Sequence, residues 1–264
     1  MRIIKVDQIT ESVKKLCMDA NYYLGEDVVA ALKDARGKEE SPLGREILDQ
    51  ILENAEIAKN EKMPLCQDTG LSAIFVELGQ DVHVEGGDFE GAVQEGIRKG
   101  YGEGYLRKSM VEDPLRRKNT GDNTPAVIST RIVEGDKIKI TILPKGGGSE
   151  NMSAIRMLKP SDGEDGVKGF VVETVQKAGG NPCPPIIVGV GIGGSFDKCA
   201  YLAKKALLRE LGSIHPDPYY AAMEKELLEK VNNTGIGPQG LGGRITALAV
   251  HIETHPCHIA SLPV

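Results

Sequence analysis

The sequence predicts a mixed α/β fold with some α+β character, organised as a single large domain over residues 1–264. Apolar residues recur at helical spacing in several long segments, and short runs rich in β-branched residues lie between them. Helices and strands do not follow the strict strand–helix–strand alternation of a parallel sheet, which accounts for the α+β character. A chain of 264 residues is long enough to bury a sizeable core.

Residues 1–59 are expected to form a helical N-terminal portion of this domain. Ile9, Val13 and Cys17 fall on one face of a helix, so we interpret Cys17 as a core residue. A second helical stripe follows, and Ser41 with Pro42 then supplies the N-cap and first residue of a third helix.

The middle of the chain reads as strands around one helix. Residues 71–78 are expected to form a strand that ends at Gly79, and residues 89–99 a helix. Residues 130–143 contain two alternating segments separated by Glu-Gly-Asp at 134–136, which predicts a β-hairpin.

The last third continues with helices and short strands. A helix over 167–178 is closed by Gly179 and Gly180, and residues 186–190 form a short buried strand. Ser195 or Asp197 then caps a helix that carries Cys199 on its apolar face, which makes Cys199 a second core cysteine. A helix over 219–231 and a strand over 244–252 complete the pattern.

Composition excludes several classes of protein. The net charge of −6 and the absence of a Lys/Arg-rich run argue against a nucleic-acid-binding surface. No apolar stretch approaches the roughly 18 residues that a membrane span needs. The first residues carry scattered charges and no apolar signal region. We therefore expect a cytoplasmic protein, in which thiols stay reduced.

Two cysteines stand apart from the helical stripes. Cys66 lies in Pro-Leu-Cys-Gln-Asp-Thr-Gly, beside an amide, a carboxylic acid and a hydroxyl. Cys183 lies in Asn-Pro-Cys-Pro-Pro, and a Cys-Pro pair also occurs at iron–sulfur ligands. They could be ligands of one metal centre assembled from distant loops, or two buried small side chains. The proline frame and the polar neighbours favour the metal centre.

Two further segments could bind an anion. Arg107 could form a bidentate pair with a substrate carboxylate, although a surface salt bridge is the ordinary role of an arginine. Gly146, Gly147 and Gly148 follow a strand and expose backbone N–H groups that could hold a carboxylate. A flexible hairpin end is the alternative for these glycines.

The segment Gly-Val-Gly-Ile-Gly-Gly at 189–194 matches a dinucleotide-binding pattern in the right context, after a strand and before a helix. The acidic residue expected about 20 positions later at the end of a second strand is missing. Close packing or anion binding at a helix terminus is therefore favoured over NAD binding. Near the C-terminus, His251, His255 and His258 lie close in sequence to Cys257. One of these histidines could act as a general acid or base, or each could have only a structural role.

Taken together, these segments resemble the class I iron–sulfur fumarate hydratase and L(+)-tartrate dehydratase family. The resemblance runs from about residue 60 to the end and corresponds to the separate alpha subunit, the N-terminal catalytic domain of the longer enzymes. It rests on five collinear motifs, namely CQDTG, LRKS with NTGDNTPA, KGGGSEN, NPCPP with GVGIGGSFDKCAYLAKKALLRE, and THPCHIASLPV.

The resemblance implies a [4Fe–4S] cluster held by three cysteines, with one iron left open as a Lewis acid for substrate. Cys66 and Cys183 match the first two ligands. The third is expected beyond Val264, because the resemblance implies that the C-terminus is truncated here; Cys257 is the alternative ligand. The resemblance also assigns Gln67, Arg107 and Gly146–Gly148 to substrate binding, and Asp68 and His258 to catalysis.

The implied activity is reversible hydration of fumarate to malate, with L(+)-tartrate dehydration as the alternative. The implied partners are a dicarboxylate substrate and a beta subunit that supplies the rest of the active site, within a higher-order oligomer. Two alternatives of other classes remain at this point: a dinucleotide-binding oxidoreductase, and an electron-transfer iron–sulfur protein, for which a fourth cysteine ligand is usual.

Overall fold

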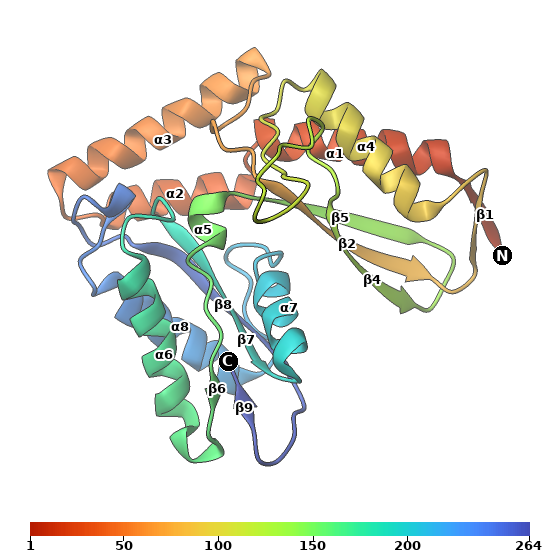
Figure 1. Ribbon diagram of the computed structural model, residues 1–264. Helices are drawn as coiled ribbons and strands as arrows, with labels where there is room; N and C mark the ends of the chain where they lie inside the picture. Colours follow the sequence, from red (N-terminus) through yellow and green to blue (C-terminus); the bar gives the residue numbers. More distant parts are fainter. The chain divides into compact units, whose positions relative to one another are not determined.

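The computed structural model describes residues 1–264 and confirms a mixed α/β fold (Figure 1). The chain forms two compact units. Unit 1 comprises Met1–Leu24 and Glu53–Gly147, and unit 2 comprises Gly25–Leu52 and Gly148–Val264. The chain passes from unit 2 to unit 1 within helix α3 (Pro42–Glu61). None of the helices has the length and apolar character that a bilayer crossing requires.

Unit 1 is built on a three-stranded sheet in the order β4-β2-β5. The central strand β2 (Leu71–Gly79) is parallel to β4 (Val127–Val133) and antiparallel to β5 (Ile138–Lys145). The predicted hairpin over 130–143 is therefore wrong, because β2 separates its two arms. The run 72–76 is buried throughout, and such a strand is best satisfied when both of its edges are hydrogen-bonded.

Two helices cover one face of this sheet, α1 (Val6–Tyr22) and α4 (Phe89–Glu103). They approach closely because α4 presents glycines to α1: a Cβ on Gly96 would lie 2.6 Å from the Cβ of Val13. Cys17 is fully buried in this core, and burial raises the pKa of its thiol to about 12. The prediction that Cys17 is a core residue is confirmed. A separate parallel pair, β1 (Arg2–Lys5) with β3 (Val82–Glu85), completes unit 1.

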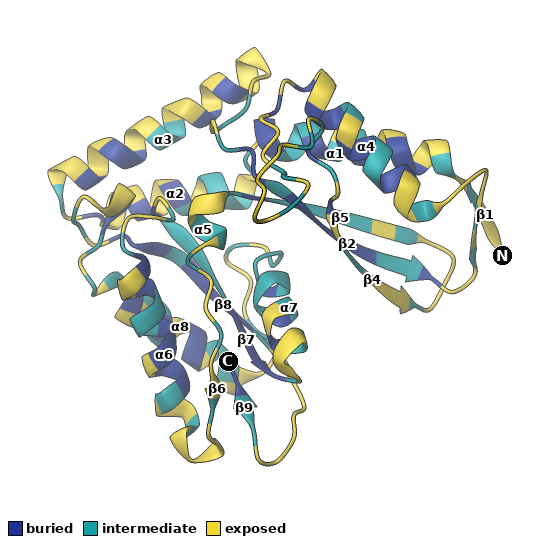
Figure 2. Cartoon of the chain, in the orientation of Figure 1, coloured by how far each residue is buried: buried dark blue, intermediate teal, exposed yellow.

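Unit 2 contains a parallel pair of strands, β7 (Ile186–Gly193) and β8 (Ala247–His255). Val190 and Ile252 pack with residues of α6 (Gly163–Ala178) and α8 (Pro218–Asn232), and the dark buried stripes of these elements are visible in Figure 2. The remaining elements of unit 2 are α2 (Glu26–Lys38), α5 (Gly147–Glu150), α7 (Phe196–Ala206), the short pair β6 (Met157–Leu158) and β9 (Leu262–Pro263), and the 3₁₀ turns η1 (Pro160–Asp162) and η2 (Pro238–Gly240).

Gly189 and Gly191 belong to strand β7 and make its contact with helix α7. A Cβ on Gly189 would lie 2.2 Å from the carbonyl oxygen of Ala203, and one on Gly191 would lie 2.2 Å from that of Cys199. Only glycine permits this separation between strand and helix. Close packing thus explains the glycine pattern, and the pattern no longer supports a dinucleotide-binding protein. Cys199 is buried and donates to the Gly191 carbonyl oxygen at 3.2 Å.

One buried carboxylate ties the α2–α3 corner of unit 2 to the start of β8. Glu39 is 0% exposed, and its carboxylate accepts the backbone N–H groups of Arg244 and Ile245 as well as those of Glu40 and Ser41, all at 2.7–3.0 Å. Burial by itself raises the pKa of Glu39, but these four N–H donors outweigh burial and hold the pKa below its ordinary value of 4.5. The carboxylate form is therefore part of the fold.

Replacing Glu39 by glutamine is expected to lower the free energy of unfolding by about 3 kcal/mol, because an amide NH₂ would face backbone donors. A depressed folded-state pKa stabilises the fold above the ordinary pKa, and this contribution disappears as pH falls through the folded-state value. The difference from wild type should therefore be complete at pH 7 and shrink below about pH 4.5. Urea unfolding followed by circular dichroism at several pH values measures the free energy of unfolding and its dependence on pH. The exposed neighbour Glu40→Gln is the control; equal loss in both variants would contradict this role.

Candidate active site

Cys66 lies in an exposed loop of unit 1 between α3 and β2. The backbone N–H of Asp68 donates to the Cys66 sulfur at 3.4 Å, and the thiol in turn contacts the side-chain oxygen of Gln67 at 3.4 Å. An exposed sulfur that receives a backbone N–H is suited to exist as a metal-bound thiolate, since such hydrogen bonds stabilise negative charge on sulfur. The structure thus places Cys66, Gln67 and Asp68 in one loop with a thiolate-stabilising donor.

The Asp68 carboxylate links this loop to the glycine segment after β5. One oxygen accepts the N–H of Gly70 at 3.0 Å, and the other accepts the N–H of Gly147 at 2.8 Å. A Cβ on Gly146 would lie 3.3 Å from the second oxygen. The structure therefore brings Asp68 together with two of the three predicted glycines. In this arrangement the N–H of Gly147 is used by Asp68.

Tyr101 of α4 and Asn123 hold the Cys66–Gly70 loop through hydrogen bonds to its backbone. The Tyr101 hydroxyl lies 2.9 Å from the carbonyl oxygen of Thr69 and 3.1 Å from that of Gly70. Asn123 donates to the same Gly70 oxygen at 3.2 Å. Both side chains are almost completely buried, at 1% and 0% exposure, so the loop rests on a rigid polar base. Burial raises the pKa of Tyr101 to about 12, and the hydroxyl stays protonated.

Asn123 also fixes the loop that carries Arg107. Its side-chain oxygen accepts the N–H of Ser109 at 2.7 Å and that of Met110 at 3.2 Å, while the Thr69 hydroxyl donates to the Arg107 carbonyl oxygen at 3.0 Å. Arg107 itself is exposed and belongs to none of the ion pairs of the chain. Its ordinary role in a surface salt bridge is therefore absent, and its guanidinium is available to an anion.

Sequence reasoning missed Tyr101 and Asn123. Asn123 lies in the NTGDNTPA motif, which gave it no individual role, and it adopts a left-handed backbone with φ of 62°. Asparagine tolerates this conformation better than most residues. Tyr101 lies on an apolar helical stripe, so its hydroxyl contact could not be inferred from spacing.

Cys183 lies in an exposed loop of unit 2 between α6 and β7. Its backbone is left-handed, with φ of 57°, a conformation that costs energy for a residue with a side chain. Gly148 packs against this loop, since a Cβ there would lie 2.6 Å from the Asn181 carbonyl oxygen. Gly148 thus lies against the loop that carries Cys183, whereas Gly146 and Gly147 lie beside Asp68.

Cys257 and His258 lie at the other end of the β7–β8 pair. Cys183 precedes the first residue of β7, whereas both of these residues follow the last residue of β8, and the two strands are parallel. Eight strand residues separate the two ends by about 25 Å. Cys257 donates to the Ser261 carbonyl oxygen at 3.3 Å, and His258 Nδ1 accepts the N–H of Ala260 at 3.1 Å. The structure does not bring either residue to Cys183.

The cysteines divide by environment as the sequence predicts. Cys17 and Cys199 are buried, and burial raises the pKa of Cys199 to about 11. The exposed thiols are Cys66, Cys183 and Cys257, and none of the five cysteines forms a disulfide. No three His, Cys, Asp or Glu side chains gather as a complete metal site. The chain therefore presents single exposed thiols on loops.

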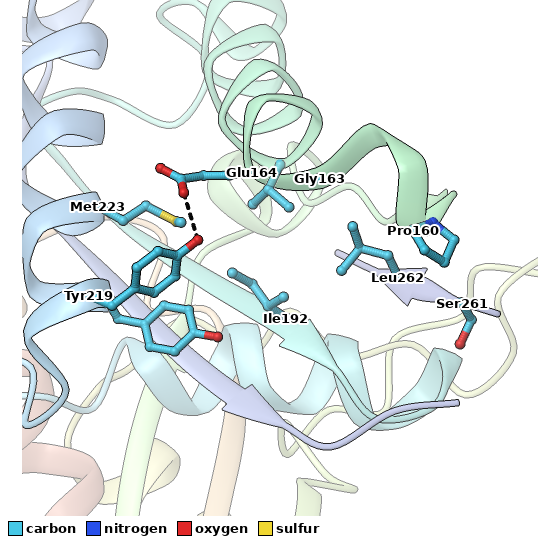
Figure 3. Close-up of a pocket in the computed structure, with 10 residues that line it drawn as sticks. Pro160, Gly163, Glu164, Ile192, Tyr219, Met223, Ser261 and Leu262 are labelled. Carbon is cyan, nitrogen blue, oxygen red and sulfur yellow. Dashed lines mark hydrogen bonds between the residues drawn. The ribbon is translucent and has the colours of Figure 1, made fainter. Parts of the chain in front are cut away.

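A cavity of about 300 Å³ lies elsewhere in unit 2, between α6, α8 and the C-terminal strand (Figure 3). Its walls are mostly apolar, with Ile192 and Met223 among them, and the Tyr219 hydroxyl donates to Glu164 at 2.6 Å at its rim. The hydrogen-bonded ion pair with Lys168, and then the Tyr219 hydroxyl, lower the pKa of Glu164. None of the predicted site residues lines this cavity.

Comparisons with known proteins agree on one family. Residues 10–264 match the model of the family described as fumarate hydratase (Fumerase). A putative L(+)-tartrate dehydratase subunit alpha from Methanocaldococcus jannaschii is 48% identical over 263 residues, which cover 97% of this chain and 92% of that protein. The L(+)-tartrate dehydratase subunits alpha of Escherichia coli and Shigella sonnei are each 35% identical over 262 residues, covering 98% of this chain and 86% of theirs.

Proposed function

Because this chain belongs to the fumarate hydratase (Fumerase) family of hydro-lyases, we propose that it is the alpha subunit of an enzyme that removes water from a 2-hydroxy dicarboxylate and adds it back. The family resemblance seen in the sequence motifs is confirmed. The similar proteins are named as alpha subunits, which supports a beta subunit as the partner of this chain. The observation that carries the proposal is the Cys66 loop, where an exposed thiol, a carboxylate and glycine N–H groups meet.

We propose Cys66 and Cys183 as two ligands of a [4Fe–4S] cluster. The donor chemistry fits, because both are exposed thiols on loops, and Cys66 receives an N–H on its sulfur. A third cysteine ligand remains a prediction. Cys257 lies at the opposite end of the β7–β8 pair from Cys183, and this position argues against Cys257 as the third ligand. When bound, a cluster with one open iron supplies a Lewis acid for the hydroxyl that leaves as water.

The chain's own residues bind and orient the substrate and move protons. Arg107, exposed and without a carboxylate partner, is proposed to bind a substrate carboxylate in bidentate fashion. Asp68 is proposed to hold or transfer a proton at the substrate hydroxyl, oriented by its bonds to Gly70 and Gly147. Gln67 offers an amide beside that position.

His258 stays a prediction as a second catalytic group. Within unit 2 His258 lies at the opposite end of the β7–β8 pair from Cys183. A role in the same reaction therefore requires that the assembled enzyme place His258 beside the substrate. The proposed location is the cytoplasm, where exposed thiols stay reduced. The proposed assembly joins alpha and beta subunits in a higher-order oligomer.

Two substrates fit this chemistry. The family description names fumarate, whereas the most similar proteins reported above are named for L(+)-tartrate. Malate and tartrate both carry a hydroxyl next to one carboxylate and a second carboxylate on the adjacent carbon. The same arginine, carboxylate and open metal position would serve both. We propose fumarate and malate as the first candidate pair and L(+)-tartrate as the second, which the names of the relatives support at least as well.

The test is turnover by the anaerobically reconstituted complex of this chain with its beta subunit. Fumarate hydration and L(+)-tartrate dehydration are measured separately, and the substrate with the higher kcat/KM is assigned. We expect the chain alone to be inactive, because the remaining substrate groups belong to the partner. Failure of an iron-loaded complex to act on either substrate would contradict the proposal, and so would full activity of the chain alone.

A further inference from the structure

A glycine-rich segment that the motif analysis did not single out supports the Cys183 loop. Residues 235–243 read Gly-Ile-Gly-Pro-Gln-Gly-Leu-Gly-Gly, and every glycine in it has a positive φ. Gly240 lies directly against the loop, since a Cβ there would be 2.5 Å from the Cα of Gly180. Cys183 and this segment belong to the same compact unit. The segment is therefore shaped to pass close to the backbone around Cys183.

Gln239 makes the direct contact. Its backbone N–H donates to the Pro184 carbonyl oxygen at 2.7 Å, and its side-chain amide donates to the same oxygen at 3.1 Å and to the Cys183 carbonyl oxygen at 3.4 Å. The carbonyl groups of two successive peptides, Cys183–Pro184 and Pro184–Pro185, are thus hydrogen-bonded by one residue.

The backbone conformation of Gln239 is unfavourable for a residue with a side chain, which indicates that the side chain has a role. Its φ is 53°, the left-handed region where glycine is usual, and the neighbouring glycines already adopt it. Gln239 is also exposed, so it contributes little to the core. A non-glycine residue at such a position persists where its side chain has a use. Cys183, which it contacts, has a left-handed φ of 57° as well.

The far end of the segment is anchored independently. Arg244 and Ile245 donate their N–H groups to the buried carboxylate of Glu39, and the Gly242 N–H donates to the Ile236 carbonyl oxygen at 2.8 Å. Because the residues after this glycine-rich segment are anchored to Glu39, the segment can restrain the Cys183 loop that it contacts. Gln239 therefore links the Cys183 backbone to a segment that is itself hydrogen-bonded to the rest of unit 2.

From these contacts we infer that Gln239 is a positioning residue that fixes Cys183 in the orientation needed to ligate the cluster. This inference rests on the proposed function, which supplies the cluster. In this role Gln239 acts through its hydrogen bonds to the Cys183 and Pro184 carbonyl oxygens. Residues that orient a metal ligand typically change metal retention by about ten- to a hundredfold when they are replaced.

Two variants separate the side chain from the backbone. Gln239→Gly keeps the backbone N–H and accepts the positive φ, so only the side-chain amide is lost. Gln239→Glu keeps the side-chain length but turns an acceptor toward the two carbonyl oxygens. Lys62→Gly is the matched control, because Lys62 is also exposed with a positive φ of 52° and lies in unit 1, away from the Cys183 loop in sequence. All three should melt within about 3 °C of wild type, as surface substitutions do.

Two measurements then test the inference. In the full chain without cluster, hydrogen exchange of the peptide containing Cys183 should accelerate in both Gln239 variants and not in Lys62→Gly. In the reconstituted complex with the beta subunit, loss of cluster absorbance to an iron chelator should be about tenfold or more faster in both Gln239 variants. Chelator resistance equal to wild type in both Gln239 variants would overturn the positioning role, even if exchange had accelerated.

Failure of the proposed function gives a different result. A wild-type complex that takes up no iron and sulfide contradicts the cluster assignment and, with it, the ligand-orienting role inferred for Gln239. A wild-type complex that holds its cluster, with Gln239 variants that hold it equally well, leaves the proposed function standing and contradicts only the inference about Gln239.

Discussion

The Cys66→Ser and Cys183→Ser variants of the reconstituted complex are expected to lose the visible absorbance of the iron–sulfur cluster and nearly all turnover. Serine keeps the size of each side chain but removes the soft thiolate that iron–sulfur clusters require. Both cysteines lie exposed on loops, so neither replacement removes core packing. The folded chain should therefore persist with the native circular dichroism spectrum while cluster binding is lost. Iron and acid-labile sulfide analysis, together with absorbance, measures this directly.

Cys257→Ser is the matched control, because Cys257 is a third exposed thiol. It lies at the opposite end of the β7–β8 pair from Cys183, so this variant should keep its cluster and its activity. Undiminished absorbance and turnover in both Cys66→Ser and Cys183→Ser would remove these residues from the metal site. Loss of the cluster in Cys257→Ser would instead identify Cys257 as a ligand and contradict the assignment of Cys183 of the same chain to the same cluster.

Asp68→Asn is expected to keep the cluster and lose turnover, with kcat lower by about a hundredfold to ten-thousandfold, the range typical of a lost general acid or base. An amide cannot transfer the proton, and it also replaces one of the two oxygens that accept the N–H groups of Gly70 and Gly147. Steady-state kinetics with the substrate assigned above measures kcat, and absorbance of the same sample reports the cluster.

The matched control for this variant is Asp88→Asn. Asp88 is an exposed N-cap of α4 whose carboxylate also accepts a backbone N–H, from Gly91. Asparagine caps helices as well as aspartate does, so this variant should be indistinguishable from wild type. Near wild-type kcat in Asp68→Asn would exclude Asp68 from the proton transfer.

Local patterns in the sequence predicted most of the individual elements. The strand β2, the helices around it and the two core cysteines follow from apolar spacing, and the structure confirms them. Pro42 begins α3 with the Gly44 N–H donating to the Ser41 hydroxyl at 3.2 Å, as the Ser-Pro pair indicates. These features depend on neighbours in the chain, which a sequence shows directly.

Pairing between distant segments was harder to predict. The short turn at 134–136 suggested a hairpin, but β4 and β5 each pair with β2 because the central strand gains partners on both edges. The same limit applies to the site. The contact between Asp68 and Gly147 spans 79 residues, and that between Gln239 and Cys183 spans 56. No local spacing encodes such contacts, so sequence motifs named Asp68, Gly147 and Cys183 but neither their hydrogen-bond partners nor Gln239.

The most direct test of the central claim is Mössbauer spectroscopy of the wild-type complex reconstituted with ⁵⁷Fe, recorded with and without substrate. The expected result is a four-iron cluster in which a single iron changes its signal when the 2-hydroxy dicarboxylate is added, because only an iron without a protein ligand can bind it. The same sample should turn the substrate over. A cluster whose irons are all unaffected by substrate would indicate electron transfer, and a folded complex that takes up no iron would contradict the cluster assignment altogether.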